Sequence, residues 1–172
     1  MSDAPCDVVY GRRLSALCEN GQSDQELKMI RVIARPTDWN GFIRRAKKAF
    51  PTEHCEALWG DVTVDGFRIT KFSMMKTNAV EDGETTVDYD DAELHRQMHL
   101  ATVAGVKFIG TVHTHPDKDF DTAASAIDHH LGSSDGERIM GVVVLYKNDK
   151  NKFVVKTDWW IPQPRIAFEL TE

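Results

Sequence analysis

The sequence has few cysteines, and their spacing gives them no structural pattern. Only three of the 172 residues are cysteine, Cys6, Cys18 and Cys55, and no Cys-x-x-Cys pair occurs. This spacing excludes a disulfide framework and a cysteine-based zinc site. A chain of this kind fits a reducing compartment, and we expect the cytoplasm.

An excess of positive charge and a long apolar run are also missing. The formal net charge is −6 at pH 7, so the chain lacks the attraction for phosphate that general nucleic-acid and anionic-membrane binders need. An Arg-Arg pair near the start is followed by an apolar stretch too short and broken for a signal-peptide core, and no run approaches a membrane span. We therefore expect proteins or small molecules as partners, with no nucleic acid and no membrane.

No internal repeat or low-complexity segment divides the chain, and its length suits one domain with its own core. We interpret the polar residues 1–28 as an N-terminal extension and residues 29–172 as the domain. Strands are expected at 29–34, 55–59, 62–64, 67–72, 106–112, 140–146 and 152–157. Helices are expected from a cap at Thr37 or Asp38 to Pro51, from Asp91 to Gly105, and over 122–131. This alternation predicts an α/β fold.

Two polar groups on the expected helices are interpreted as ordinary helix surface. The first helix carries four basic residues, Arg44, Arg45, Lys47 and Lys48. A solvated face is the common meaning of such a group, and a docking patch for an acidic partner is the alternative. In the second helix, His95 and His99 are four residues apart, but Arg96 stands where a zincin motif needs glutamate. We expect a polar helix face there as well.

The segment after residue 106 carries the main chemical pattern. An apolar run ends in His113 and His115, and alternate side chains of a strand share a face, so both imidazoles should point the same way. Pro116 then turns the chain away, and in the helix expected next, Ser125 and Asp128 lie three residues apart on one face. Two imidazoles and one carboxylate leave a fourth position open, which is typical of catalytic zinc rather than structural zinc.

A zinc hydrolase also needs a proton acceptor. Zinc lowers the pKa of the water that it binds from about 15.7 to near 7, and a nearby carboxylate can take the proton and return it to a leaving amine. The candidate for this acceptor is Glu53, which lies two residues before the strand expected at 55–59.

These elements together resemble the signature of the JAMM (JAB/MPN) metalloprotease family. The matching residues are Glu53 in a P-x-E-x-C pattern, the run His113-Thr114-His115-Pro116, and the run Ser125-Ala126-Ile127-Asp128. The elements follow the order of the family over most of the chain. The resemblance implies a cytidine-deaminase-like three-layer α/β/α fold with a mixed central sheet.

The resemblance also implies a role for each residue. His113, His115 and Asp128 would bind Zn²⁺, Glu53 would be the general acid/base, and Ser125 would help to stabilise the oxyanion. Nine residues separate His115 from Ser125, more than is usual in the family, and we interpret this as a lengthened loop. The usual spacing would place alanines at the positions of the serine and the aspartate, which would leave no site.

A second departure lies close to Glu53. The family commonly has glycine after the cysteine of this strand, and here the residue is Glu56. Strand alternation should place Glu56 on the face opposite to Glu53. We keep Glu53 as the expected base, with Glu56 as the alternative.

Two classes of function follow. The resemblance implies a zinc metallopeptidase, a deubiquitinase-like isopeptidase acting at the C-terminus of a ubiquitin-like protein. The compact chain resembles stand-alone prokaryotic or phage members, which implies partners from ubiquitin-like conjugation, with E1/E2-like proteins, or from sulfur-carrier pathways. The alternative is a non-catalytic MPN-fold interaction module. A cysteine hydrolase using Cys55 and His54 is disfavoured, because neighbouring strand residues face opposite ways.

Overall fold

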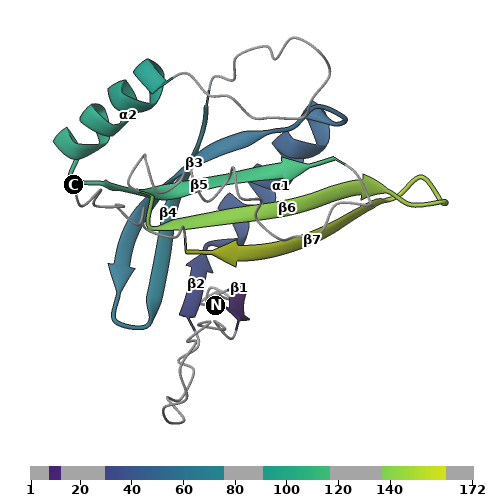
Figure 1. The fold of residues 1–172 in the computed structure, drawn as a ribbon, viewed down its shortest axis with the longest axis horizontal. Helices are drawn as coiled ribbons and strands as arrows, with labels where there is room; N and C mark the ends of the chain where they lie inside the picture. Colours follow the sequence, from purple (N-terminus) through teal and green to yellow (C-terminus); the bar gives the residue numbers. More distant parts are fainter. Residues whose placement is uncertain (1–7, 13–29, 76–90, 117–136, 162–172) are drawn as a thin grey trace, which may run out of the picture.

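The computed structural model describes residues 8–12, 30–75, 91–116 and 137–161, which form one seven-stranded mixed sheet and two helices. The strands are β1 (Val8–Arg12), β2 (Ile30–Ala34), β3 (Cys55–Thr63), β4 (Gly66–Met74), β5 (Lys107–His115), β6 (Ile139–Lys147) and β7 (Phe153–Trp160), and the helices are α1 (Pro36–Ala49) and α2 (Asp91–Val103) (Figure 1). The strand order is β1-β2-β4-β3-β5-β6-β7, in which β2–β4 and β5–β6 are parallel and the other pairs are antiparallel. The predicted α/β class is confirmed.

Strand β3 is one continuous strand, although the sequence predicted two shorter ones. Its pairing with β4 shifts register between Trp59 and Gly60, and the hairpin continues to Thr63. A Cβ atom at Gly60 would lie 1.9 Å from the carbonyl oxygen of Arg68, so only glycine allows the two backbones to come this close. The strand therefore continues through a polar, glycine-containing stretch that lacks a clear strand pattern.

Strand β5 is longer than expected and contains both histidines. It pairs antiparallel with β3, where Cys55 lies opposite His113, and parallel with β6, where His113 lies beside Val142. The end of β5 is thus next to the beginning of β3. This arrangement brings the segment that carries Glu53 to the histidines.

Helix α1 begins at Pro36, before the predicted cap residues. Arg35 is the N-cap and makes no side-chain capping bond, so the expectation of a Thr37 or Asp38 cap is wrong. Proline suits the first helical position because its φ is already helical and its missing N–H would have had no partner there. The Asp38 carboxylate accepts a hydrogen bond from Arg35 Nε at 2.6 Å instead.

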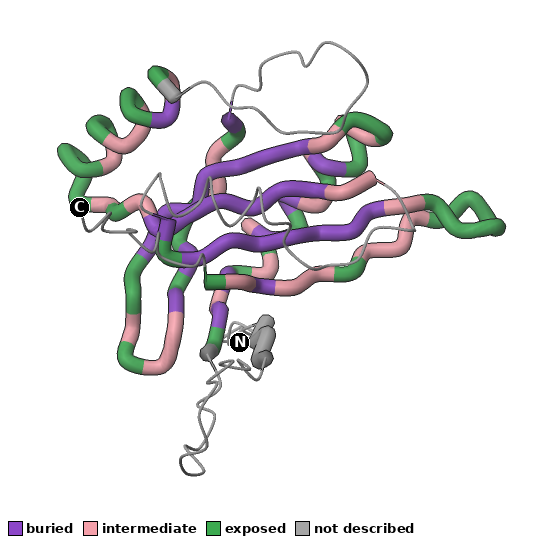
Figure 2. Tube along the Cα trace, viewed as in Figure 1, coloured by how far each residue is buried: buried purple, intermediate pink, exposed green. Residues whose placement is uncertain are grey.

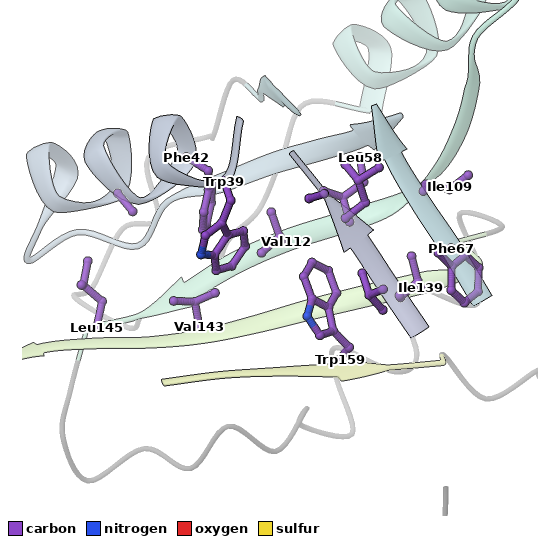
Figure 3. Packing of buried hydrophobic residues seen from close by; sticks show 14 residues of the cluster. Trp39, Phe42, Leu58, Phe67, Ile109, Val112, Ile139, Val143, Leu145 and Trp159 are labelled. Atoms are coloured by element: carbon purple, nitrogen blue, oxygen red, sulfur yellow. The ribbon is translucent and has the colours of Figure 1, made fainter. Parts of the chain in front are cut away.

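The two helices cover opposite faces of the sheet. Trp39, Phe42 and Ala46 of α1 belong to a buried cluster that includes Leu58, whereas α2 packs on the residues next to it in β3. Side chains alternate between the faces of a strand, so these neighbours point in opposite directions. Figure 3 shows the α1 cluster, in which Trp39 and Phe42 lie above Val112, Val143 and Trp159.

Helix α2 is more exposed than α1. Leu94 is buried, and Met98 and Ala101 pack partly against Cys55, Ala57 and Trp59 of β3. Ala92, in the first turn of the helix, is exposed. His95 and His99 are exposed, as expected. Figure 2 shows the contrast between the largely exposed α2 and the buried middle of β3, β5 and β6.

The remaining expectations concern the N-terminal residues, the connection between β6 and β7, and the helix predicted over 122–131. Strand β1 lies within the predicted N-terminal extension and pairs with β2, while the proposed division at residue 28 stays a prediction. The turn between β6 and β7 is held by Asn148, whose Oδ1 accepts hydrogen bonds from the backbone N–H groups of Lys150 and Lys152. The predicted helix over 122–131 lies outside the described residues. In the four ranges given above, no helix has the length and apolarity needed to cross a membrane.

Candidate metal centre

The two histidines of β5 converge at the end of the strand. Nε2 of His113 lies 3.2 Å from Nε2 of His115, and their ring centroids are 5.0 Å apart. His113 is buried and His115 is partly buried. The predicted common orientation of the two side chains is therefore present.

The separation of these nitrogens fits a zinc ion. Two nitrogens bound tetrahedrally to zinc at about 2.0–2.1 Å lie about 3.3 Å apart, close to the 3.2 Å found here. Without metal, the same two atoms can share one proton in a hydrogen bond. The distance is compatible with the two imidazole ligands that the sequence predicts, and their role as ligands stays a prediction.

Glu53 lies at the end of the sheet where β5 finishes. The backbone of His54 pairs with Thr114, whose N–H donates to the His54 carbonyl at 3.0 Å. In return, the His54 N–H donates to Thr114 Oγ1 at 2.9 Å. The residue before His54 is therefore beside the His115 end of β5, and Glu53 is partly buried there. Its assignment as the general base stays a prediction.

The remaining predicted site residues, Ser125 and Asp128, lie outside the described residues. Within the ranges that the structure describes, no three histidine, cysteine, aspartate or glutamate side chains form a group that could hold a metal ion. The proposed ligand set depends on Asp128 for its third member. Asp128 and the oxyanion role of Ser125 remain predictions.

Glu56, the alternative base, is held in a polar cluster on the other face of the sheet. Its side chain is 0% exposed. Arg45 of α1 donates two hydrogen bonds to its carboxylate, at 2.6 and 2.7 Å, and His54 Nε2 lies 2.6 Å from Oε1. The expectation that all four basic residues of α1 form a solvated face is therefore wrong for Arg45. Arg44, Lys47 and Lys48 are exposed, as expected.

The charges of this cluster stabilise one another. Burial alone would raise the pKa of Glu56, but hydrogen bonds from Arg45 and His54 outweigh it and hold that pKa below its ordinary value. The hydrogen bond to Glu56 in turn raises the pKa of Arg45. Glu56 is therefore an ionised, fully paired carboxylate, which makes it a poor proton acceptor.

The sequence interpretation missed the roles of Arg45 and His54. The sequence position of Glu56 could have indicated a partner, because a carboxylate in an apolar strand must be paired or hydrogen-bonded when it is buried. Which of the four cations of the helix would supply the partner depends on how α1 lies across the sheet.

We expect the Glu56→Gln variant to lose about 2–4 kcal/mol of unfolding free energy at pH 7, because Arg45 would lose its ionic partner. The folded pKa of Glu56 is lowered, so its contribution is present above the unfolded pKa and is lost as pH falls through the folded one. The difference between variant and wild type should therefore shrink below about pH 4. Urea denaturation at several pH values measures it.

The matched control is Glu93→Gln, which makes the same chemical change in the exposed Glu93–Arg96 pair of α2. We expect a far smaller and less pH-dependent loss there. A Glu56→Gln deficit that stayed constant, or grew, on acidification would contradict the assignment of an ionised Glu56.

Cys55 does not form a nucleophile–base pair with its neighbour. Its side chain is buried in the apolar cluster beneath α2, whereas the His54 ring contacts Glu56 and Phe42 on the α1 face. The structure thus agrees with the low weight that the sequence gives to a cysteine hydrolase using Cys55 and His54.

The comparison with known families supports the resemblance found in the sequence. Residues 39–161 match the profile of Prok-JAB, the prokaryotic homologs of the JAB domain, over more than half of the chain. The chain belongs to this family. The matched range spans β3 and β5. It also includes every candidate site residue, namely Glu53, His113, His115, Ser125 and Asp128.

The fold of this Prok-JAB chain is similar to known structures. The solution structure of a protein from Desulfitobacterium hafniense has a TM-score of 0.51 and 19% identity, with 72% of this chain and 80% of that chain covered. A JAB1/MPN domain protein from Archaeoglobus fulgidus has a TM-score of 0.40 and 18% identity, covering 69% and 82%. A protein from Salinibacter ruber has a TM-score of 0.47 and 20% identity, covering 79% and 92%. Among curated proteins, none matches the sequence. The first likeness supports the fold alone.

Proposed function

We propose that this Prok-JAB chain is a zinc-dependent metallopeptidase of the isopeptidase type, which hydrolyses an amide bond at the C-terminus of a ubiquitin-like protein. The observation that carries the proposal is the 3.2 Å approach of the two Nε2 atoms, at the sheet end that also bears Glu53. The proposal includes the cytidine-deaminase-like three-layer arrangement as the finer description of the fold, and the cytoplasm as its location.

In this proposal, His113, His115 and Asp128 would hold zinc. When bound, it supplies a Lewis acid that polarises the scissile carbonyl and makes water acidic enough to lose a proton near neutral pH. Glu53 accepts that proton and returns it to the leaving amine. The Ser125 hydroxyl donates a hydrogen bond to the carbonyl oxygen as negative charge develops there.

The proposed substrates are ubiquitin-like proteins that end in Gly-Gly, either conjugated to lysine or carrying a C-terminal extension. E1/E2-like conjugation proteins or sulfur-carrier proteins would then be functional partners. The net charge of −6 favours protein substrates over nucleic acid. The family resemblance supports this substrate class, and the residues themselves support the metal, the water and the base.

A direct test uses a ubiquitin-like protein ending in Gly-Gly, joined through an amide to a fluorogenic aminocoumarin. We expect the zinc-loaded chain to release the fluorophore, a chelator to stop the release, and added zinc to restore it. Zinc-loaded protein that cleaves neither this substrate nor a Gly-Gly isopeptide to lysine would contradict the proposal. That result would favour the non-catalytic interaction module.

A further inference from the structure

The cluster of Arg45, Glu56 and His54 ties helix α1 to the beginning of β3. Arg45 approaches Glu56 through a bidentate pair, which fixes the orientation of both groups as well as their distance. The Arg45 side chain is 34% exposed and the Glu56 side chain 0%, so the pair extends from the protein surface into the interior. A paired carboxylate at this depth cannot move without breaking hydrogen bonds in a medium of low dielectric constant.

The ring of His54 is held on two sides. Its Nε2 lies 2.6 Å from Glu56 Oε1, and its ring centroid lies 5.8 Å from that of Phe42, with 30° between the planes. Phe42 is itself fully buried in the α1 cluster. The rotation of the His54 side chain is therefore restricted by a hydrogen bond and by packing, both of which involve α1 or its ion pair.

The backbone of His54 connects this cluster to the candidate metal centre. His54 exchanges two hydrogen bonds with Thr114, and Thr114 lies between the two converging histidines. Glu53 is the next residue along the chain. The position of Glu53 relative to the histidine pair thus depends on the pairing of His54 with Thr114.

We propose that Arg45, Glu56 and His54 are positioning residues, which hold Glu53 at the proper place for proton transfer by locking the start of β3 against the end of β5. The inference rests on the proposed function. Glu56, which contacts both Arg45 and His54, is then the centre of this cluster. General-base catalysis requires the base within hydrogen-bonding reach of the proton that it accepts, so small displacements of Glu53 reduce the rate.

The first test needs no turnover. Amide hydrogen exchange is measured by NMR on the full zinc-loaded chain, for the wild type, Glu56→Gln and the control Glu93→Gln. In Glu56→Gln the β6–β7 amides should accelerate only by the loss of global stability, and we expect exchange at His54 and Thr114 to accelerate at least about tenfold more than at those amides. Unchanged exchange at both residues, or an equal increase throughout the sheet, would overturn the proposal.

The second test is a double-mutant cycle on turnover. Glu56→Gln should lower kcat about tenfold, with KM and zinc content close to the wild type, because the substrate and metal contacts remain. In a Glu53→Gln background the same change should cost nothing further, since Glu56 acts only through Glu53. The same fold loss in both backgrounds would assign Glu56 an effect of its own and overturn the proposal.

A conservative variant separates positioning from a general requirement for charge. Arg45→Lys keeps the positive charge but lacks the planar fork, whereas Arg45→Ala removes both. We expect exchange at His54 to be fastest in Arg45→Ala and intermediate in Arg45→Lys. Arg45→Ala with wild-type exchange and wild-type kcat would overturn the proposal, even if Glu56→Gln failed to fold.

Failure of this inference can be distinguished from failure of the proposed function. A zinc-loaded wild type without hydrolytic activity refutes the proposed function, and Arg45, Glu56 and His54 then have no reaction to support. If the wild type hydrolyses the amide and Glu53→Gln does not, but Glu56→Gln keeps the wild-type kcat, only the positioning role is refuted.

Discussion

Glu53→Gln is expected to lower kcat for amide hydrolysis by about 10²–10⁴-fold while the zinc content stays at the wild-type level. The amide keeps the size and most of the contacts of the carboxylate but cannot accept a proton. Because the loss is one of proton transfer, KM should change little. Initial rates with the aminocoumarin substrate, together with elemental analysis of the same samples, measure both quantities.

The control for this change is Glu93→Gln in α2, an equivalent substitution in an exposed ion pair, which should retain wild-type turnover. Full activity in Glu53→Gln would remove Glu53 from the reaction. Loss of zinc from Glu53→Gln would recast it as a metal ligand, which would contradict the assignment of His113, His115 and Asp128 as the complete set of protein ligands.

His113→Asn and His115→Asn are each expected to weaken zinc binding by more than about 100-fold, beyond the loss typical when only a supporting residue is removed. Each replacement takes away one of two nitrogens that lie 3.2 Å apart at the end of β5. Hydrolysis should fall to the level of chelator-treated wild type. Competition with a zinc-binding dye measures the affinity.

The chain provides a matched control in α2. His95 and His99 are four residues apart and exposed on one helix face, so the double variant His95→Asn/His99→Asn removes two imidazoles away from β5. Zinc affinity and turnover should stay at the wild-type level. Equal losses from the α2 and β5 variants would show that the metal is bound by surface histidines.

Much of the fold could be predicted because its signals are local. Apolar runs bounded by Pro36, Pro51 and Gly105 indicated the helices and most strands, and their alternation gave the α/β class. The continuation of β3 through Gly60 was missed, because it depends on a close approach to β4 rather than on a local pattern. Strand β1 was missed because a short edge strand in a polar segment has little signal of its own.

In the candidate site, too, the features set by local strand geometry could be predicted and those set by tertiary packing could not. The common orientation of His113 and His115 follows from the period of a strand, and the structure confirms it. The opposite orientation of Glu56 follows from the same rule and agrees with its contacts to α1. The Arg45–Glu56 pair could not be predicted, because it joins a helix to a strand through their tertiary packing.

Elemental analysis of zinc, on protein purified without added metal, tests the central claim most directly. The wild type should contain about one zinc per chain, as expected for a catalytic site with three protein ligands and one open position. Asp128→Ala should contain little, which would establish the third ligand and the lengthened loop. A wild type without zinc, even after reconstitution, would show that the Prok-JAB fold is present here without its chemistry.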